Sequence, residues 1–152
     1  MNLISRYGVF KYTKIVAFVF FVCLQIAHAQ TIYVPDDYSK IQWAVANATV
    51  GDVVIVRDGT YIENVVINVS ITLRSENGSS NCTIRALNTA SPVISVLAND
   101  VQIIGFTIEG TQTGVAGISV TGDNCYISEN LITDNGRGVY LSQSSGNSIT
   151  MS

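Results

Sequence analysis

The sequence predicts an all-β protein of the right-handed parallel β-helix class. We expect a three-faced solenoid with about 24 residues per coil and an N-terminal capping α-helix. Two observations predict the solenoid: a gapless internal repeat, and short bursts of alternating apolar residues within each repeat. A third observation, apolar residues at helical spacing ahead of the first repeat, predicts the cap.

The repeat appears when residues 82–110 are aligned with residues 106–134. At this offset of 24, eight of the 29 aligned positions are identical, where about two would be expected from average composition. Other pairs agree in character, as Asn99 does with Asp123. Self-similarity at a fixed period is typical of solenoids, so each period corresponds to one coil.

Apolar residues within each period come in i, i+2 pairs, which predicts strands because alternate side chains of a strand face the same side. Gly, Asn and Asp separate the pairs and supply turn conformations. We therefore expect three strands per coil, with inward residues stacked in three columns: Ile94/Val96, Ile118/Val120 and Val139/Leu141; Ile71/Leu73, Val101/Ile103, Cys125/Ile127 and Ile149; Cys82/Ile84, Phe106/Ile108 and Ile132.

The coil length varies at two places. The spacing from Leu73 to Ile103 is 30 residues, and we assign the excess to an exposed loop at residues 77–81. The spacing from Val120 to Leu141 is 21 residues, which shortens a turn.

Residues 38–47 predict the helix that covers the start of the stack, where the core and the first strand edge would otherwise be open. Ser39 is the expected N-cap, and the apolar residues at helical spacing are Ile41, Ala44, Val45 and Ala48. The alternative is an ordinary surface helix.

Residues 1–29 have the parts of a secretory signal peptide. Three basic residues precede an apolar run from Ile15 to Leu24, and Ala27-His28-Ala29 forms a small-x-small cleavage site. The alternative, a permanent membrane anchor, needs a run of about 20 apolar residues. We expect residues 30–52 to form the first strand and the capping helix, and residues 53–152 to form coils of a stack that is truncated at the C-terminus. The expected location is secreted or cell surface, or periplasmic in a bacterium with two membranes.

Removal of residues 1–29 leaves five basic and eleven acidic residues, a net charge of about −6, and no histidine. This balance disfavours nucleic acid as a partner, and we expect no membrane span after cleavage. Copper sites need His, Met or Cys donors. The mature chain offers only Met151 and two thiols that we expect to be buried, so copper is not an expected cofactor.

The chain resembles the NosD-like and pectin-lyase-like right-handed β-helix proteins, which include archaeal and bacterial surface proteins. The resemblance implies the fold across nearly all of the mature chain, whereas for function it implies any of several classes, from lyases and esterases to inert scaffolds. The segments that carry it are Thr31–Pro35, Ile41–Ala44, Gly51–Val56, Gly59–Ile67, Ser70–Leu73, Gly138–Leu141 and Gly146–Thr150.

The segment Gly59–Asn64 looks like one shared with pectin methylesterases, which makes Glu63 a candidate ligand-binding residue. The alternative reading is a structural turn carboxylate. No strand carries the paired aspartates of that family, and no pair of acids follows Asp36 and Asp37. We therefore assign no catalytic residue and no bound organic cofactor.

Asp123, Glu129 and Asp134 form the one local cluster of acids, with Arg137 beside it. Carboxylates are calcium ligands, so these acids are candidate Ca²⁺ ligands and Arg137 is a candidate ligand-binding residue. The alternative is that they are solvated corner residues.

Cys82 and Cys125 fall on different faces and two coils apart, about 10 Å by strand spacing. A disulfide requires a shorter Cα separation. We expect two buried free thiols.

Four Asn-x-Ser/Thr triplets are candidate glycosylation sites: Asn47, Asn68, Asn77 and Asn81.

Together these observations favour an exported surface module, not catalytic, that presents a ladder face to a polysaccharide or a surface protein. The alternative is the N-terminal piece of a polysaccharide-processing enzyme, either a uronic-acid polymer lyase or a glycoside hydrolase. We expect the uncovered C-terminal edge to pair with missing coils or with another subunit.

Overall fold

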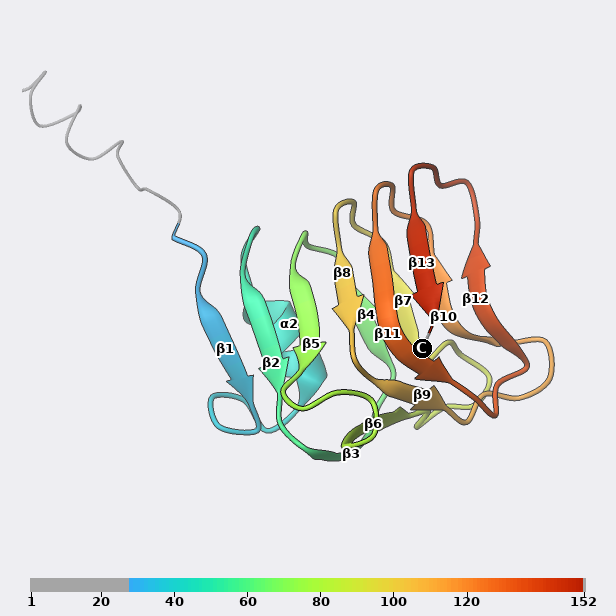
Figure 1. The fold of residues 1–152 in the computed structure, drawn as a ribbon, viewed down its shortest axis with the longest axis horizontal. Helices are drawn as coiled ribbons and strands as arrows, with labels where there is room; N and C mark the ends of the chain where they lie inside the picture. Colours follow the sequence, from blue (N-terminus) through green and yellow to red (C-terminus); the bar gives the residue numbers. More distant parts are fainter. Residues whose placement is uncertain (1–27, 152) are drawn as a thin grey trace, which may run out of the picture.

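The computed structural model describes residues 28–151; the expected signal peptide lies almost entirely outside them. These residues form a parallel β-helix with one short helix near its start (Figure 1). The elements are β1 (Thr31–Val34), α2 (Ile41–Asn47), β2 (Val53–Val56), β3 (Gly59–Ile62), β4 (Val65–Ile67), β5 (Thr72–Ser75), β6 (Cys82–Arg85), β7 (Ile94–Val96), β8 (Gln102–Ile104), β9 (Thr107–Glu109), β10 (Ala116–Val120), β11 (Tyr126–Ile132), β12 (Arg137–Leu141) and β13 (Ser148–Met151).

The strands stack in three parallel ladders, one for each face of the solenoid. The first ladder runs β1, β2, β5, β8, β11 and β13, and the second runs β3, β6, β9 and the end of β11. The third runs β4, β7, β10 and β12. Strand β11 belongs to two ladders because a register shift between Ser128 and Asn130 bends it around a corner.

The three predicted columns of inward residues are confirmed. Ile94 pairs with Ile118, which pairs in turn with Val139. The other two columns have the expected register as well: Leu73, Ile103, Ile127 and Ile149; Ile84, Ile108 and Ile132. Within the middle coils these side chains are fully buried, and their removal from water is the main favourable term for folding.

The long coil is also confirmed. Its excess residues lie between β5 and β6, in the turn that includes residues 77–81. The corresponding connection one coil later, from Ile104 to Thr107, is much shorter. The loop therefore projects from one corner of an otherwise regular stack.

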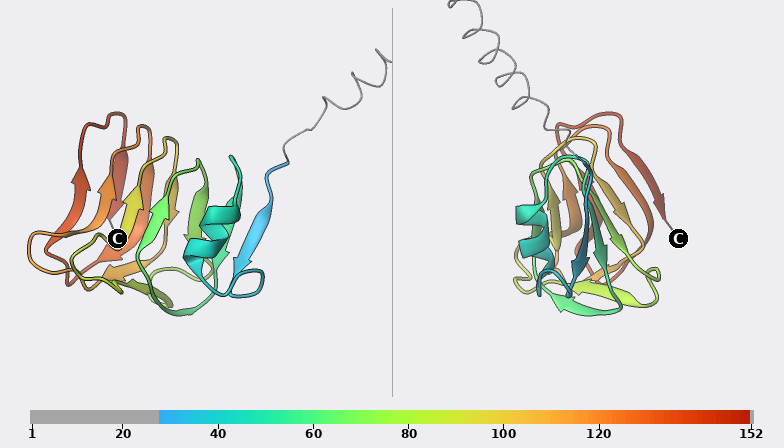
Figure 2. Two further views of the ribbon diagram at one scale, coloured as in Figure 1. Left: turned by 180° about the vertical axis from the view of Figure 1, so that it is seen from behind. Right: turned by 90° about the vertical axis from the view of Figure 1, so that its left-hand side faces the viewer.

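The cap is confirmed in position. Helix α2 packs beside β4 at the end of the third ladder (Figure 2). Its residues Ile41, Ala44 and Val45 are buried. The Gln42 side chain continues the ladder, because its Oε1 accepts the Val66 N–H at 2.7 Å and its Nε2 donates to the Val66 carbonyl at 3.3 Å. The helix thus satisfies part of the first strand edge.

The predicted start of the helix is wrong. The N-cap residue is Lys40, not Ser39, and it makes no side-chain capping bond. Glu63 caps the helix instead: its two carboxylate oxygens accept the N–H groups of Ile41 and Gln42, both at 3.0 Å. A carboxylate from the next coil satisfies the first-turn donors, so no residue adjacent in sequence is needed.

Candidate binding face

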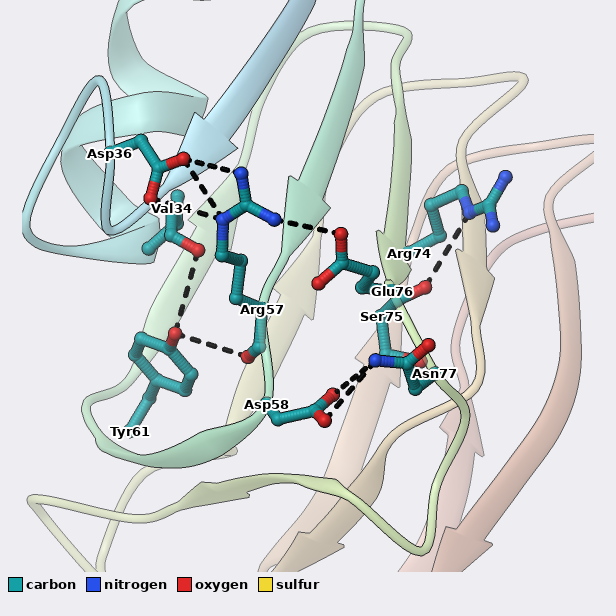
Figure 3. Close-up of polar contacts among 9 residues, drawn as sticks. All are labelled: Val34, Asp36, Arg57, Asp58, Tyr61, Arg74, Ser75, Glu76 and Asn77. Atoms are coloured by element: carbon teal, nitrogen blue, oxygen red, sulfur yellow. Dashed lines mark hydrogen bonds and ion pairs between the residues drawn. The ribbon is translucent and has the colours of Figure 1, made fainter.

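A group of polar contacts lies at the corner between the first and second ladders, beside the ends of β2 and β5. Arg57 lies at the end of β2 and forms the centre of one group (Figure 3). Its Nε donates to both Asp36 carboxylate oxygens, at 2.9 and 3.0 Å, and its Nη1 donates to Glu76 at 2.8 Å. The guanidinium hydrogen bonds lower the pKa of Asp36, and the two carboxylates raise the pKa of Arg57.

These ion pairs tie the turn after β1 to the corners after β2 and β5. The Arg57 and Asp36 side chains are each more than a third exposed, so the pairs contribute little to stability. Their effect on the site is that Arg57 and one carboxylate oxygen of Glu76 are already engaged in hydrogen bonds.

The same corner is closed by two further contacts. Asn77 donates to both carboxylate oxygens of Asp58, at 3.0 and 3.1 Å. Tyr61 donates its hydroxyl to the Arg57 carbonyl at 3.1 Å, and partial burial raises its pKa. The bonds from Asn77 to Asp58, together with the Arg57–Glu76 pair, hold the loop at residues 76–81 against the first coils (Figure 3).

A cavity of about 280 Å³ lies beside this group, where the loop overhangs the first ladder. Its volume is close to the lower limit of about 300 Å³ for small-molecule sites. Residues from three successive coils line it: Arg74, Ser75, Glu76, Gly78, Ile104, Gly105 and Glu129.

The three acids predicted as calcium ligands do not come together. Asp123 accepts hydrogen bonds from the Ser145 N–H at 2.7 Å and the Ser145 hydroxyl at 3.1 Å. Glu129 lines the cavity, and Asp134 is an exposed corner residue. Residues 28–151 contain no group of three or more His, Cys, Asp or Glu side chains that could hold a metal ion.

The two candidate ligand-binding residues are also separated. Glu63 is buried beneath helix α2, where both of its oxygens cap the helix. Arg137 begins β12 and places its guanidinium over the Tyr140 ring, 5.4 Å from the centroid. Glu63 is therefore structural in this fold, whereas Arg137 lies on an exposed strand.

The four candidate glycosylation sites are all exposed, but their amides differ. Asn47 donates to the Trp43 carbonyl at 2.8 Å and Asn81 donates to the Asn77 carbonyl at 3.1 Å. Asn77 is bound to Asp58 as described above. Within residues 28–151, the side-chain amide of Asn68 makes none of the hydrogen bonds found at the other three sites.

Both cysteines are buried free thiols, as predicted. Burial is the main reason that the pKa of Cys82 is raised to about 12, and it also raises the pKa of Cys125. A thiol with so high a pKa is a poor nucleophile at neutral pH, so these residues act as core side chains.

Sequence reasoning missed Arg74 and Gly105 as members of a site. The available signals were the long coil, whose extra loop forms one wall, and the alignment of Gly105 with Glu129 at the repeat offset.

Within residues 28–151 no helix has the length and apolar character needed to cross a membrane.

The chain is 37% identical over 108 residues to a cell surface glycoprotein of Methanothermus fervidus. The match covers 70% of this chain and 17% of that protein, so the chain spans about a sixth of the length of this relative. The similarity confirms the expected secreted or cell-surface location. No family model matches the chain.

Solved structures with a similar fold include two pectin methylesterases. One, crystallised with a hexasaccharide, superposes with a TM-score of 0.62, and another, from Erwinia chrysanthemi, superposes with a TM-score of 0.60. Each is 18% identical, and each match covers 82% of this chain and 49% of the other chain. These matches confirm the pectin-lyase-like parallel β-helix fold, and an identity this low carries no information on activity.

Proposed function

We propose that this chain is a surface module that holds a carbohydrate or protein partner against the outward side of the first ladder, without catalysis. The observation that carries the proposal is the cavity of about 280 Å³ on this side, formed where the inserted loop overhangs β8. The similarity to a segment of a cell surface glycoprotein supports a role at the cell surface.

The chemistry of this side supports binding. Asp36 and Glu76 on this side are the ion-pair partners of Arg57. Glycoside hydrolysis uses two carboxylates that flank the scissile bond, one of them with a raised pKa. Hydrogen bonds from Arg57 lower the pKa of Asp36, which is the opposite of the shift that a general acid needs.

The test uses the full chain on an array of neutral and uronic-acid glycans, together with an assay for release of reducing ends or methanol from pectins. We expect binding of a glycan without turnover. Turnover that is lost on substitution of an acid on this side would contradict the proposal and support the rival, a polysaccharide-processing enzyme.

A further inference from the structure

The inserted loop forms a firm wall of the cavity. The Gly78 N–H donates to the Ser75 hydroxyl at 3.0 Å, and the Thr107 hydroxyl donates to the Ser79 carbonyl at 2.8 Å. The loop is therefore attached to its own coil and to the next one. In repeat proteins, insertions of this kind map to one face, often the binding face, and an ordered wall lowers the entropy lost on binding.

Gly105 keeps the floor of the cavity open. Its φ is +80°, and a Cβ atom there would lie 2.6 Å from the Ser75 hydroxyl oxygen. A larger residue would therefore displace Ser75, which holds the loop. Ile104 beside it is partly exposed and contributes an apolar surface.

Glu129 occupies the position that matches Gly105 one coil later. Its φ is +57°, in the left-handed region that glycine adopts without strain and Glu adopts at a cost of about 1 kcal/mol. The chain thus keeps a carboxylate at the mouth of the cavity where its own repeat has glycine. Asp134 has a similar φ outside the cavity, so it is the place of Glu129 in the cavity lining, and not its backbone conformation alone, that makes it a candidate for binding.

The charged groups of the cavity are mostly uncommitted. Arg74 makes one long bond, from its Nε to the Ser75 carbonyl at 3.5 Å (Figure 3). Among residues 28–151, the ion pairs are made by Arg57 and Arg85, so Arg74 and Glu129 face the same cavity without pairing. Glu76 has one oxygen bound to Arg57.

The charges that line the cavity are mixed. One guanidinium and two carboxylates line it, so an anionic or a cationic ligand is attracted by one kind of group and repelled by the other. A neutral polyhydroxylated ligand satisfies both, because a hydroxyl donates to a carboxylate and accepts from a guanidinium.

We infer that this cavity binds one neutral hexose unit of a glycan, with Arg74 and Glu129 as hydrogen-bonding partners and Ile104 under the sugar ring. The inference rests on the proposed function, since it names the ligand class of the same face. It excludes a uronate as the preferred unit.

The experiment measures the affinity of the full chain for neutral oligosaccharides of glucose, galactose and mannose and, in parallel, for oligogalacturonates. Two variants remove the polar partners, Arg74→Gln and Glu129→Gly. The second installs the residue of the matching coil and relieves the positive φ, so we expect it to stay folded by circular dichroism. Asp134→Asn is the matched control, because Asp134 is an exposed corner acid with a φ of +52° outside the cavity.

We expect binding of at least one neutral oligosaccharide, weakened roughly 10- to 100-fold by each cavity variant and unchanged by Asp134→Asn. The inference fails if the folded cavity variants bind as the parent does, if oligogalacturonates bind at least as tightly, or if no neutral oligosaccharide binds. Glycan binding that is indifferent to both cavity variants would overturn this inference and leave the surface-binding module standing. Pectin turnover would overturn the module itself.

Discussion

The two ends of the solenoid differ in how deeply they bury equivalent apolar residues. Ile118 and Val120 in β10 are fully buried, whereas their partners one coil later are not: Val139 is half-buried and Leu141 is 44% exposed. At the other end, Val65 and Ile67 in β4 are fully buried because helix α2 lies beside them. Burial in this fold therefore comes from the neighbouring coil or helix, and not from the apolar character of the residue itself.

The covered end also contains two buried carboxylates, Glu63 and Asp52. Each accepts backbone N–H groups: Glu63 from the first turn of α2, and Asp52 from Gln30 and Thr49. Backbone N–H groups that would otherwise lack an acceptor at the covered end are thus satisfied by these two carboxylates. In the last coils, Glu129 and Asp134 are exposed instead.

The largest expected effect comes from the matched pair Ile118→Ala and Leu141→Ala. Ile118 lies between Ile94 and Val139 with no exposed surface, so its truncation leaves a cavity and lowers the free energy of unfolding by about 2–5 kcal/mol. Leu141→Ala removes a side chain that is already partly in water, and we expect a loss of less than about 1 kcal/mol. Urea denaturation of both variants measures the difference. Equal losses would contradict the interpretation that the neighbouring coil sets burial.

A smaller effect is expected from Glu63→Ala at the covered end. The change leaves the N–H groups of Ile41 and Gln42 without their acceptor, and we expect a loss of about 1–2 kcal/mol. Hydrogen exchange at these two amides should become faster than the loss of global stability alone explains. Exchange in β10 should change only as much as the global stability does. Ser39→Ala is the control, because Lys40 and not Ser39 is the N-cap residue. A larger loss for Ser39→Ala than for Glu63→Ala would refute the assignment of the cap.

The smallest expected effect is the pH dependence of the stability that Asp52 contributes. Hydrogen bonds from the Gln30 and Thr49 backbones lower its pKa, so its contribution to stability is present above its ordinary value of about 3.9 and is lost as the pH falls through the lowered value. We expect Asp52→Asn to be less stable by on the order of 1 kcal/mol at pH 7, with the gap narrowing below pH ~4. Thermal denaturation from pH 7 to pH 2 measures the gap, and a gap that stays constant would show that ionisation of Asp52 is not involved.

The internal repeat allowed the register of the coils to be predicted from the sequence. Ile94 and Ile118 carry the same neighbours at an offset of 24 residues, and parallel stacking brings such residues together. The long coil at residues 77–81 was visible for the same reason. The start of the helix was not, because its cap is Glu63, 22 residues after Ile41, and no local pattern marks a capping residue at that separation.

The sequence by itself determined which residues face the core, because the alternation within each strand and the period between coils are both local or repeated signals. The tertiary structure decided where the polar groups meet. Arg74, Gly105 and Glu129 lie in three different coils and line one cavity, since an inserted loop overhangs their corner. Contacts between side chains on adjacent coils depend on turn lengths and backbone conformations that the apolar pattern does not encode.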